Sequence, residues 1–234
     1  MTDLEEAIKV TRESILFISE NHPDRATRLN NLGNNLESRF ERTGELQFIE
    51  EAIKVAREAV NSTPDLRPKQ SQLLNDLGNK LENRYHRTGD TQNIEEAIQV
   101  ARKAVDLRLK DHPDQAVWLS NLGRKLKNRY ERTGELQDLN GAIQAGRQSA
   151  ERTPENHPDL AVRLNSLANQ LEHQYGRTGE IQNIEEAIQV TQKAINLCPE
   201  NHPDRAGLLS SLGNRLRYMY YQTDEIATLE EVFY

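Results

Sequence analysis

Apolar residues recur at helical spacing along the whole chain. Between residues 23 and 41 they form one stripe, with small residues included, at Ala26, Leu29, Leu32, Gly33, Leu36 and Phe40. A second stripe follows between residues 47 and 61, at Ile49, Ala52, Ile53, Ala56, Ala59 and Val60. Spacings of three and four residues place each set on one face of an α-helix. No segment shows sustained alternation of apolar and polar residues, so we expect an all-α protein.

The two predicted helices belong to a repeat of 45 residues. A Leu-Gly-Asn motif sets the register, and its small residue recurs at Gly33, Gly78, Gly123, Ala168 and Gly213. An Arg-Thr-Gly motif ends at Gly44, Gly89, Gly134 and Gly179, and the fifth copy has Gln222-Thr223-Asp224 instead. A fixed period of this length predicts stacked helix pairs, which together form an α-solenoid.

Short motifs mark the predicted helix ends. His-Pro-Asp precedes the first helix in four copies, starting at His22, His112, His157 and His202. Proline suits the first helical turn and aspartate there complements the helix dipole, so we interpret the motif as a helix start with a capping role. Glycine at the end of Arg-Thr-Gly is typical of a helix C-terminus.

The register divides residues 1–234 as a single solenoid domain. We expect a leading half repeat over 1–20, repeats at about 21–65, 66–110, 111–155 and 156–200, and a degenerate closing repeat over 201–234. The chain then begins with a second-type helix over about 3–19 and ends within another over about 226–234. This organisation predicts about 11 helices in total.

Composition alone would suggest a weakly folding chain, because only 35% of residues are hydrophobic and the mean hydropathy is −0.82. A solenoid resolves this, since a thin stack of helices keeps much of its surface in water. The longest apolar runs have four residues, far short of the roughly 20 that span a membrane. Residues 1–6 show no secretory signal. We therefore expect no membrane association and a cytoplasmic location.

Charge and cysteine content narrow the function further. The net charge is −7, which argues against nucleic acid as a partner because such binding needs a concentrated basic surface. One cysteine, Cys198, cannot form an internal disulfide or a cysteine-based metal site, and we expect it to be buried or idle.

The repeat resembles the tetratricopeptide repeat, through Leu-x-x-Leu-Gly-x-x-Leu, the following Ala-Ile pair and a proline near residue 64. That repeat usually has about 34 residues, and the additional ones here extend the first helix and the two connections. The longer form is similar to repeats of kinesin light chains and of long fungal arrays. The resemblance covers essentially the whole chain. It implies a right-handed superhelix of antiparallel helix pairs, and a non-enzymatic binding module or scaffold as the function.

One departure from the family pattern concerns aromatic residues. The family often has a large aromatic in the second helix, where this chain has Ala56, Ala101, Gly146 and Thr191. Rings instead follow the first helix, at Phe40, Tyr85, Tyr130, Tyr175 and Tyr220. We expect these five rings to fill the core space that the small residues leave, and a ring ladder that stacks on a ligand is the alternative.

In the resembling family the first helices line a concave groove that binds extended peptides. Carried over by helix face, the resemblance implies an exposed polar row that includes Glu37, Glu82 and the following candidate groove residues: Asn30, Asn34, Asn75, Asn79, Arg124, Lys127, Asn128, Asn165, Asn169, His173, Asn214 and Arg217. An asparagine amide offers both a donor and an acceptor, which matches a peptide backbone. Recurrence through recent duplication, without any use in binding, is the alternative.

Two cations break the asparagine series in the third repeat. Arg124 replaces the asparagine and Lys127 follows one turn later. This basic spot is able to receive an acidic group of a protein or peptide ligand. Equally, either cation could pair with Glu82 or Glu172 of a neighbouring repeat.

No catalytic, phosphate-binding or cofactor motif is present in the sequence. The four motif histidines fall one per repeat, too far apart to share a metal. We therefore expect no enzyme activity, no cofactor and no metal. An enzyme would have to use the residues that break the repeat symmetry, which are Arg124, Lys127, His173, Arg217 and Tyr218.

Neither end of the chain has the polar surface that caps a solenoid. The last residues are rich in tyrosine, with Tyr218, Tyr220 and Tyr221, and end on Val232-Phe233-Tyr234. Two interpretations follow, one in which the chain is cut from a longer array and one in which its ends contact partners. Self-association through the terminal helices is the second hypothesis for function, and a self-capping hydrophobic end is its alternative.

Overall fold

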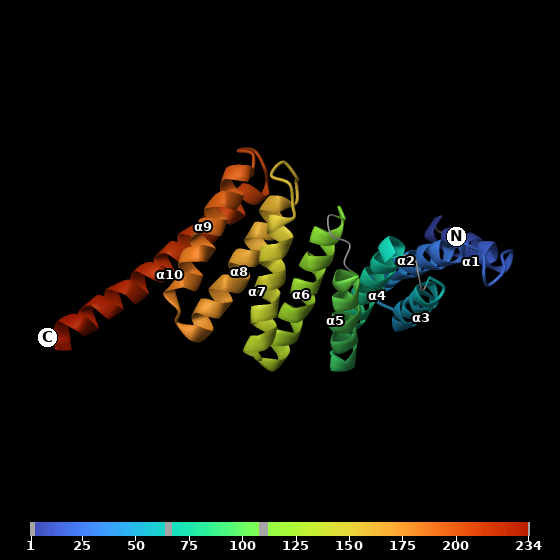
Figure 1. The fold of residues 1–234 in the computed structure, drawn as a ribbon, viewed down its shortest axis with the longest axis horizontal. Helices are drawn as coiled ribbons and strands as arrows, with labels where there is room; N and C mark the ends of the chain where they lie inside the picture. The colour runs from blue at the N-terminus through green and yellow to red at the C-terminus, as the bar shows by residue number, and fades with distance from the viewer. Residues whose placement is uncertain (1–2, 64–66, 108–111, 234) are drawn as a thin grey trace. The chain divides into compact units, whose positions relative to one another are not determined.

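The computed structural model describes residues 3–63, 67–107 and 112–233. These residues form helices and no strands (Figure 1). The helices are α1 Asp3–Leu16, α2 Arg25–Thr43, α3 Leu46–Asn61, α4 Arg67–Thr88, α5 Thr91–Asp106, α6 Gln115–Thr133, α7 Leu136–Glu151, α8 Leu160–Thr178, α9 Ile181–Leu197 and α10 Asp204–Phe233. The all-α prediction is confirmed.

Consecutive helices pack against each other, as the stripes of apolar residues require. In the pair α2–α3 the stripe of the first helix and that of the second are both buried, with Leu36 and Ile49 fully inaccessible. Gly33 faces Ala52, as expected, since a Cβ atom on Gly33 would lie in ordinary van der Waals contact with the carbonyl oxygen of Ala52, at 3.5 Å. The same arrangement recurs in α4–α5 and α8–α9.

The chain packs as two compact units, Met1–Arg129 and Tyr130–Tyr234. In the second unit the larger apolar cluster joins Tyr130, Leu139, Leu171 and Ile184 from successive helices. A smaller cluster around Leu160, Ile195 and Leu208 connects α8, α9 and α10. None of the helices in the described residues is long and apolar enough to cross a membrane.

Glycine ends the first helix of each complete pair, as predicted. Gly44, Gly89, Gly134 and Gly179 adopt positive φ angles of 69° to 72°. The N–H of each donates to the carbonyl four residues earlier, which for Gly44 is that of Phe40 at 2.7 Å. Only glycine adopts this left-handed conformation without a steric cost, so the Arg-Thr-Gly motif sets the length of the first helix.

The His-Pro-Asp motif starts helices by a different contact from the predicted one. At Asp24 and Asp159 the aspartate carboxylate makes no capping hydrogen bond. Instead the aspartate backbone N–H donates to the Nδ1 of the motif histidine, at 3.1 Å for His22 and 3.1 Å for His157. The same contact occurs at His112 and His202. The imidazole therefore satisfies a backbone donor that no helical carbonyl can reach.

The end of the chain differs from the prediction. Residues 204–233 form one helix of 30 residues, rather than a first helix and a closing helix over 226–234. Position 224 is equivalent to the stop glycines and holds aspartate, which has a steric cost in the left-handed conformation. The helix consequently continues, and the described residues contain ten helices rather than about 11. Residue 234 lies outside the described residues.

The prediction for the five rings is confirmed in part. Phe40, Tyr130 and Tyr175 are buried, and Tyr85 is half-buried. For Tyr220 the prediction is wrong, because its side chain is 59% exposed. The four covered rings belong to helices that are followed by a second-type helix, whereas Tyr220 belongs to α10, which does not turn back.

Glycine substitutions test the stop signal. In Gly89→Ala the added methyl would meet no atom within 4 Å, so the φ of 71° is its only cost. We expect the free energy of unfolding to fall by about 1 kcal/mol. Gly207→Ala is the matched control, since Gly207 lies within α10, also has open space around it, and has no positive φ. It should gain up to about 1 kcal/mol. Urea denaturation measures both, and equal effects would contradict the assignment.

Candidate functional site

The candidate groove residues lie on α2, α4, α6, α8 and α10, the first-type helices. They are less exposed than predicted, and Asn30, Asn75 and Glu82 are buried. The reason is that first helices of adjacent repeats contact each other along this face, as α2 and α4 do. Asn34, Arg124, His173, Asn214 and Arg217 are exposed, and Asn79, Lys127, Asn128, Asn165 and Asn169 are half-buried.

A buried lysine joins α2 to α4. Lys80 is almost completely inaccessible. Its Nζ donates to Oδ1 of Asn34 at 2.8 Å and to Oε2 of Glu37 at 3.0 Å. The other carboxylate oxygen of Glu37 accepts from Nδ2 of Asn83 at 2.8 Å. Both acceptors of the ammonium thus come from the preceding repeat, which compensates the cost of burying its charge.

The same arrangement joins α4 to α6, one repeat later. Nζ of Lys125 donates to Oδ1 of Asn79 at 2.7 Å and to Oε2 of Glu82 at 3.0 Å. Glu82 is itself fully buried, and its second oxygen accepts from Asn128 at 2.6 Å. Arg124 adds an ion pair to Glu82 at 3.0 Å. The basic spot expected in this repeat is therefore partly neutralised by Glu82, as one of the sequence alternatives proposed.

In the second unit an arginine takes the place of the lysine. Arg215 of α10 donates to Oδ1 of Asn169 and forms an ion pair with Glu172 at 3.0 Å. It also donates to the hydroxyl of Thr191 on α9 at 2.9 Å. Thr191 occupies the position where the other repeats have alanine or glycine, so the larger cation has gained an additional acceptor. We call Lys80, Lys125 and Arg215, each with its asparagine and glutamate, the buried cation sites.

Glycines make room for the two lysine sites. A Cβ atom on Gly33 would lie 3.1 Å from Cε of Lys80, and one on Gly78 would lie 3.1 Å from Cε of Lys125. Either contact is tighter than ordinary van der Waals packing. The glycine of the Leu-Gly-Asn motif therefore accommodates the lysine stem of the next repeat as well as the paired second helix.

The buried cation sites fix the orientation of the groove asparagines. An ammonium or guanidinium group has only donors, so the amide atom that faces it must be the oxygen. In Asn34, Asn79 and Asn169 the oxygen is occupied in this way. Within the described residues, none of the hydrogen bonds involves the Nδ2 group of these three. Each asparagine thus presents a donor rather than a donor and an acceptor.

A second set of contacts lies one turn earlier on the same helices. Nδ2 of Asn30 donates to Asp76 at 3.0 Å, and Nδ2 of Asn121 donates to Oδ1 of Asn75 at 2.8 Å. The equivalent asparagine in the second unit is Asn165, whose buried Oδ1 has no donor in the described part of the chain.

Sequence reasoning missed the three cations that organise this face. The available signal was a lysine or arginine directly after the Leu-Gly-Asn motif, at 80, 125 and 215. This position lies beside the apolar stripe, where an unpaired charge is unfavourable. Its acceptors are 46 and 43 residues away in sequence, a separation that helical periodicity does not specify.

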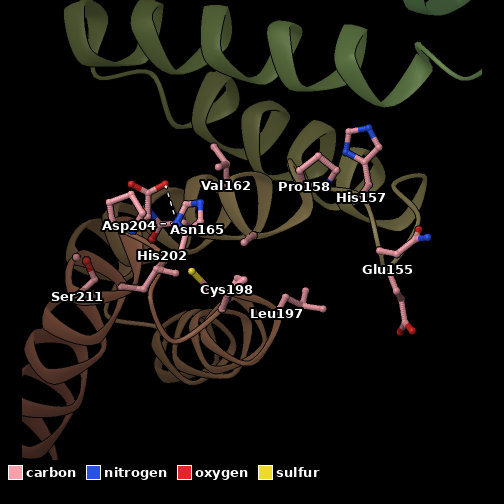
Figure 2. Close-up of a pocket in the computed structure, with 16 residues that line it drawn as sticks. Glu155, His157, Pro158, Val162, Asn165, Leu197, Cys198, His202, Asp204 and Ser211 are labelled. Atoms are coloured by element: carbon pink, nitrogen blue, oxygen red, sulfur yellow. Dashed lines mark hydrogen bonds and ion pairs between the residues drawn. The ribbon is translucent and has the colours of Figure 1, made fainter.

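A cavity of about 730 Å³ lies in the second unit, outside the predicted site. It is formed by the start of α8, the end of α9 and the start of α10, as Figure 2 shows. Cys198 is buried in its wall, as predicted for this residue. Among the residues the structure describes, there is no cluster of histidine, cysteine, aspartate and glutamate side chains able to hold a metal ion.

Burial has a measurable consequence at Lys125. It lowers the pKa of this lysine to about 8 from the ordinary 10.5, against the opposing effect of Glu82. Between these values the unfolded chain binds a proton that the folded chain does not, so stability should rise with pH across this range. The free energy of unfolding of the wild type, relative to that of Lys125→Met, should therefore rise by roughly 3 kcal/mol over this range.

Urea denaturation from neutral pH upward measures that difference. Lys54→Met removes an exposed lysine of α3 and controls for loss of a surface charge. A difference between wild type and Lys125→Met that stays constant with pH would contradict a lowered pKa of Lys125 in the folded protein.

The chain is similar to known proteins in part of its sequence and in its fold. A profile described as tetratricopeptide repeat matches residues 25–65. No curated protein sequence matches the chain. Among solved structures, BtubC (BKLC) from P. vanneervenii is similar with a TM-score of 0.66 at 15% identity, covering 99% of this chain and 93% of that one. At these identities the similarity shows the fold alone.

Two further structures share the fold. A putative kinesin light chain from Podosopora anserina with nearly identical TPR-like repeats has a TM-score of 0.61 at 18% identity, covering 90% of this chain and 93% of its own. YrrB, described as a TPR protein with an unusual peptide-binding site, has a TM-score of 0.54 at 17% identity and coverage of 85% and 80%. The matched residues 25–65 are one copy of the repeat that recurs through the sequence. The chain thus matches the tetratricopeptide-repeat profile in this copy and is similar to tetratricopeptide-repeat proteins in fold.

Proposed function

We propose that residues 1–234 form a tetratricopeptide solenoid that acts as a non-enzymatic, cytoplasmic interaction module, and that it binds an extended peptide segment along its first helices. The observation that carries this proposal is the fixed orientation of Asn34, Asn79 and Asn169. Each side-chain oxygen is held by a buried cation, and each Nδ2 group is left as a donor. Donors that are oriented before binding lose little entropy when a ligand arrives.

The polarity of these donors indicates the ligand chemistry. Amide N–H groups pair with acceptors, which in a peptide are backbone carbonyl oxygens or carboxylates. Backbone carbonyls recur along any extended segment, so this recognition depends little on the ligand's sequence. An acidic ligand group near Arg124 remains part of the proposal, although Arg124 already pairs with Glu82. The remaining groove candidates, from Asn30 to Arg217, are proposed to border the bound segment.

The peptide class of ligand is also supported by similarity. YrrB, which shares the fold, is described as having an unusual peptide-binding site. Tetratricopeptide folds serve as interaction scaffolds, and this chain has the helix-pair packing they require.

A substitution of asparagine by aspartate separates the two roles of the amide. Asn34→Asp, Asn79→Asp and Asn169→Asp keep an oxygen for each buried cation but replace the outward donor by an acceptor. We expect the triple variant to fold with unchanged or higher stability. Peptides selected on the wild type from a library of short extended sequences should bind it more weakly, by about fivefold for each of these asparagines that they contact, because each lost hydrogen bond contributes about 1 kcal/mol. Isothermal titration calorimetry measures the affinities.

The matched control carries the same added charge away from the first helices. Gln99→Glu, Gln144→Glu and Gln189→Glu lie at equivalent exposed positions of α5, α7 and α9, and binding should be unaffected there. The proposal fails if the library yields no binder, or if selected peptides bind the aspartate variant as tightly as the wild type.

Self-association is a second candidate function, favoured by the exposed apolar face of α10. Leu209 and Leu216 are 50% and 41% exposed, whereas the equivalent Leu29 and Leu36 of α2 are 2% and 0% exposed. In α2 these leucines are covered by the second-type helix α3. Within the described residues no second-type helix follows α10 to cover this face. The helix α1 of a second copy has the second-type pattern, with Ala7 and Ile8 only half-buried.

Leu216→Lys tests this candidate by placing a charge at the centre of the exposed face. We expect the wild type to show a mass that rises with concentration in sedimentation equilibrium, and the variant to remain monomeric. Leu46→Lys, at an exposed leucine of α3, serves as the control. A wild type that is monomeric at millimolar concentration would exclude self-association.

A further inference from the structure

The cavity in the second unit has an apolar interior. Ala161 and Val162 of α8, Leu197 of α9 and Leu208 of α10 contribute to its walls. Its volume of about 730 Å³ falls within the range of cavities that bind small ligands or a few peptide residues.

One of the residues that line the cavity has no side chain. Gly207 of α10 is equivalent to Thr27, Gln72, Val117 and Val162 in the other repeats. A Cβ atom on Gly207 would meet nothing within 4 Å. A larger residue at this position of the cavity lining would therefore meet no steric obstacle at its Cβ atom.

One buried acceptor in the cavity wall lacks a donor. The Oδ1 atom of Asn165 is inaccessible and accepts no hydrogen bond in the described residues. At the equivalent Asn75, Oδ1 accepts from Asn121 of the next repeat. The corresponding residue here is Ser211, whose side chain is shorter and makes no such bond. Oδ1 of Asn30 is also unpaired, but Asn30 does not line this cavity. A buried acceptor without a partner costs stability that a bound donor would restore.

The charged residues that line the cavity are acidic, and Arg205 beside it donates to the backbone carbonyl oxygens of Ile195 and Cys198. Glu155 and Asp204 line it, and none of its lining residues is lysine or arginine. The two lining histidines use Nδ1 to accept from the backbone N–H of Asp159 and Asp204, so each neutral ring carries its proton on Nε2. This surface favours a ligand with a positive charge and disfavours an anion.

We propose that this cavity binds a peptide segment in which an aliphatic side chain is flanked by basic residues. The aliphatic side chain occupies the apolar interior, and an adjoining backbone N–H donates to Oδ1 of Asn165. The flanking cations lie near Glu155 and Asp204. The inference rests on the proposed function for its ligand class, but the residues involved differ from the asparagine donors of Asn34, Asn79 and Asn169.

The probe is the capped peptide acetyl-Arg-Leu-Arg-amide, titrated into the ¹⁵N-labelled chain and followed by NMR. We expect saturable shifts of the Asn165 side-chain amide and of the backbone amides of Gly207 and Leu208. Two related peptides test the chemistry. Replacing leucine by serine removes the aliphatic group, and replacing both arginines by glutamate reverses the charge. Each should weaken binding at least tenfold.

Two variants test the site itself. Gly207→Val introduces the residue found at Val117 and Val162, fills the open space and should weaken binding at least tenfold without lowering the melting temperature. Asn165→Leu removes the acceptor and should have a similar effect on affinity. The Asn34/Asn79/Asn169 aspartate triple variant should bind this probe as the wild type does, which distinguishes failure of this site from failure of the groove.

The inference is overturned by any of three results. The probe may give no shifts up to its solubility limit, in which case a water molecule is the partner of Asn165. The glutamate or serine peptide may bind as tightly as the probe. Gly207→Val may leave the affinity unchanged, which would place the bound peptide elsewhere.

Discussion

A buried cation needs acceptors on every accessible side, and this requirement organises the first-helix face of the protein. At Lys80, Lys125 and Arg215 the acceptors come from the preceding repeat, as one asparagine oxygen and one glutamate carboxylate. Removing one partner would leave a buried charge uncompensated, which costs far more than a surface ion pair contributes. These contacts therefore fix how adjacent first helices lie against each other, in a way that an apolar seam alone would not.

The same requirement determines what the face is able to bind. Had the asparagines been free, they would offer donors and acceptors equally. Because a cation holds each oxygen, Asn79 and its equivalents offer donors of fixed direction. The structural use of these residues is therefore compatible with the proposed binding role, and it sets which hydrogen-bonding group of each amide a ligand would meet. The asparagines recur at 45-residue intervals, and from the sequence this could reflect either a use in binding or duplication alone. Their hydrogen bonds to the buried cations give a physical reason for the recurrence under either interpretation.

The helix pairs were predictable because their causes are local. Stripes of apolar residues and stop glycines such as Gly44 act within a few residues of their position. The partners of Lys125 were not predictable. Periodicity shows on which face of its own helix a residue lies, but not which residue of another helix lies opposite it. The prediction that Glu82 is exposed was wrong for the same reason, since its side chain is fully buried. At the C-terminal end, the aspartate at position 224 was visible in the sequence. Its consequence, a helix that continues to Phe233, follows only once the glycine at the equivalent positions is understood to end the helix.

Differences between repeats show other ways in which a buried cation obtains its hydrogen-bond acceptors. In the last site Ala168 replaces glycine, arginine replaces lysine, and Thr191 provides a hydroxyl for the longer cation. These three positions lie far apart in sequence yet change together, as expected if one contact links them. Ser211 and Gly207 are changes without such compensation, since Oδ1 of Asn165 is left unpaired beside Ser211 and the space beside Gly207 is open. A stable array gains nothing from either change, and this is the physical ground for looking to a ligand at that position.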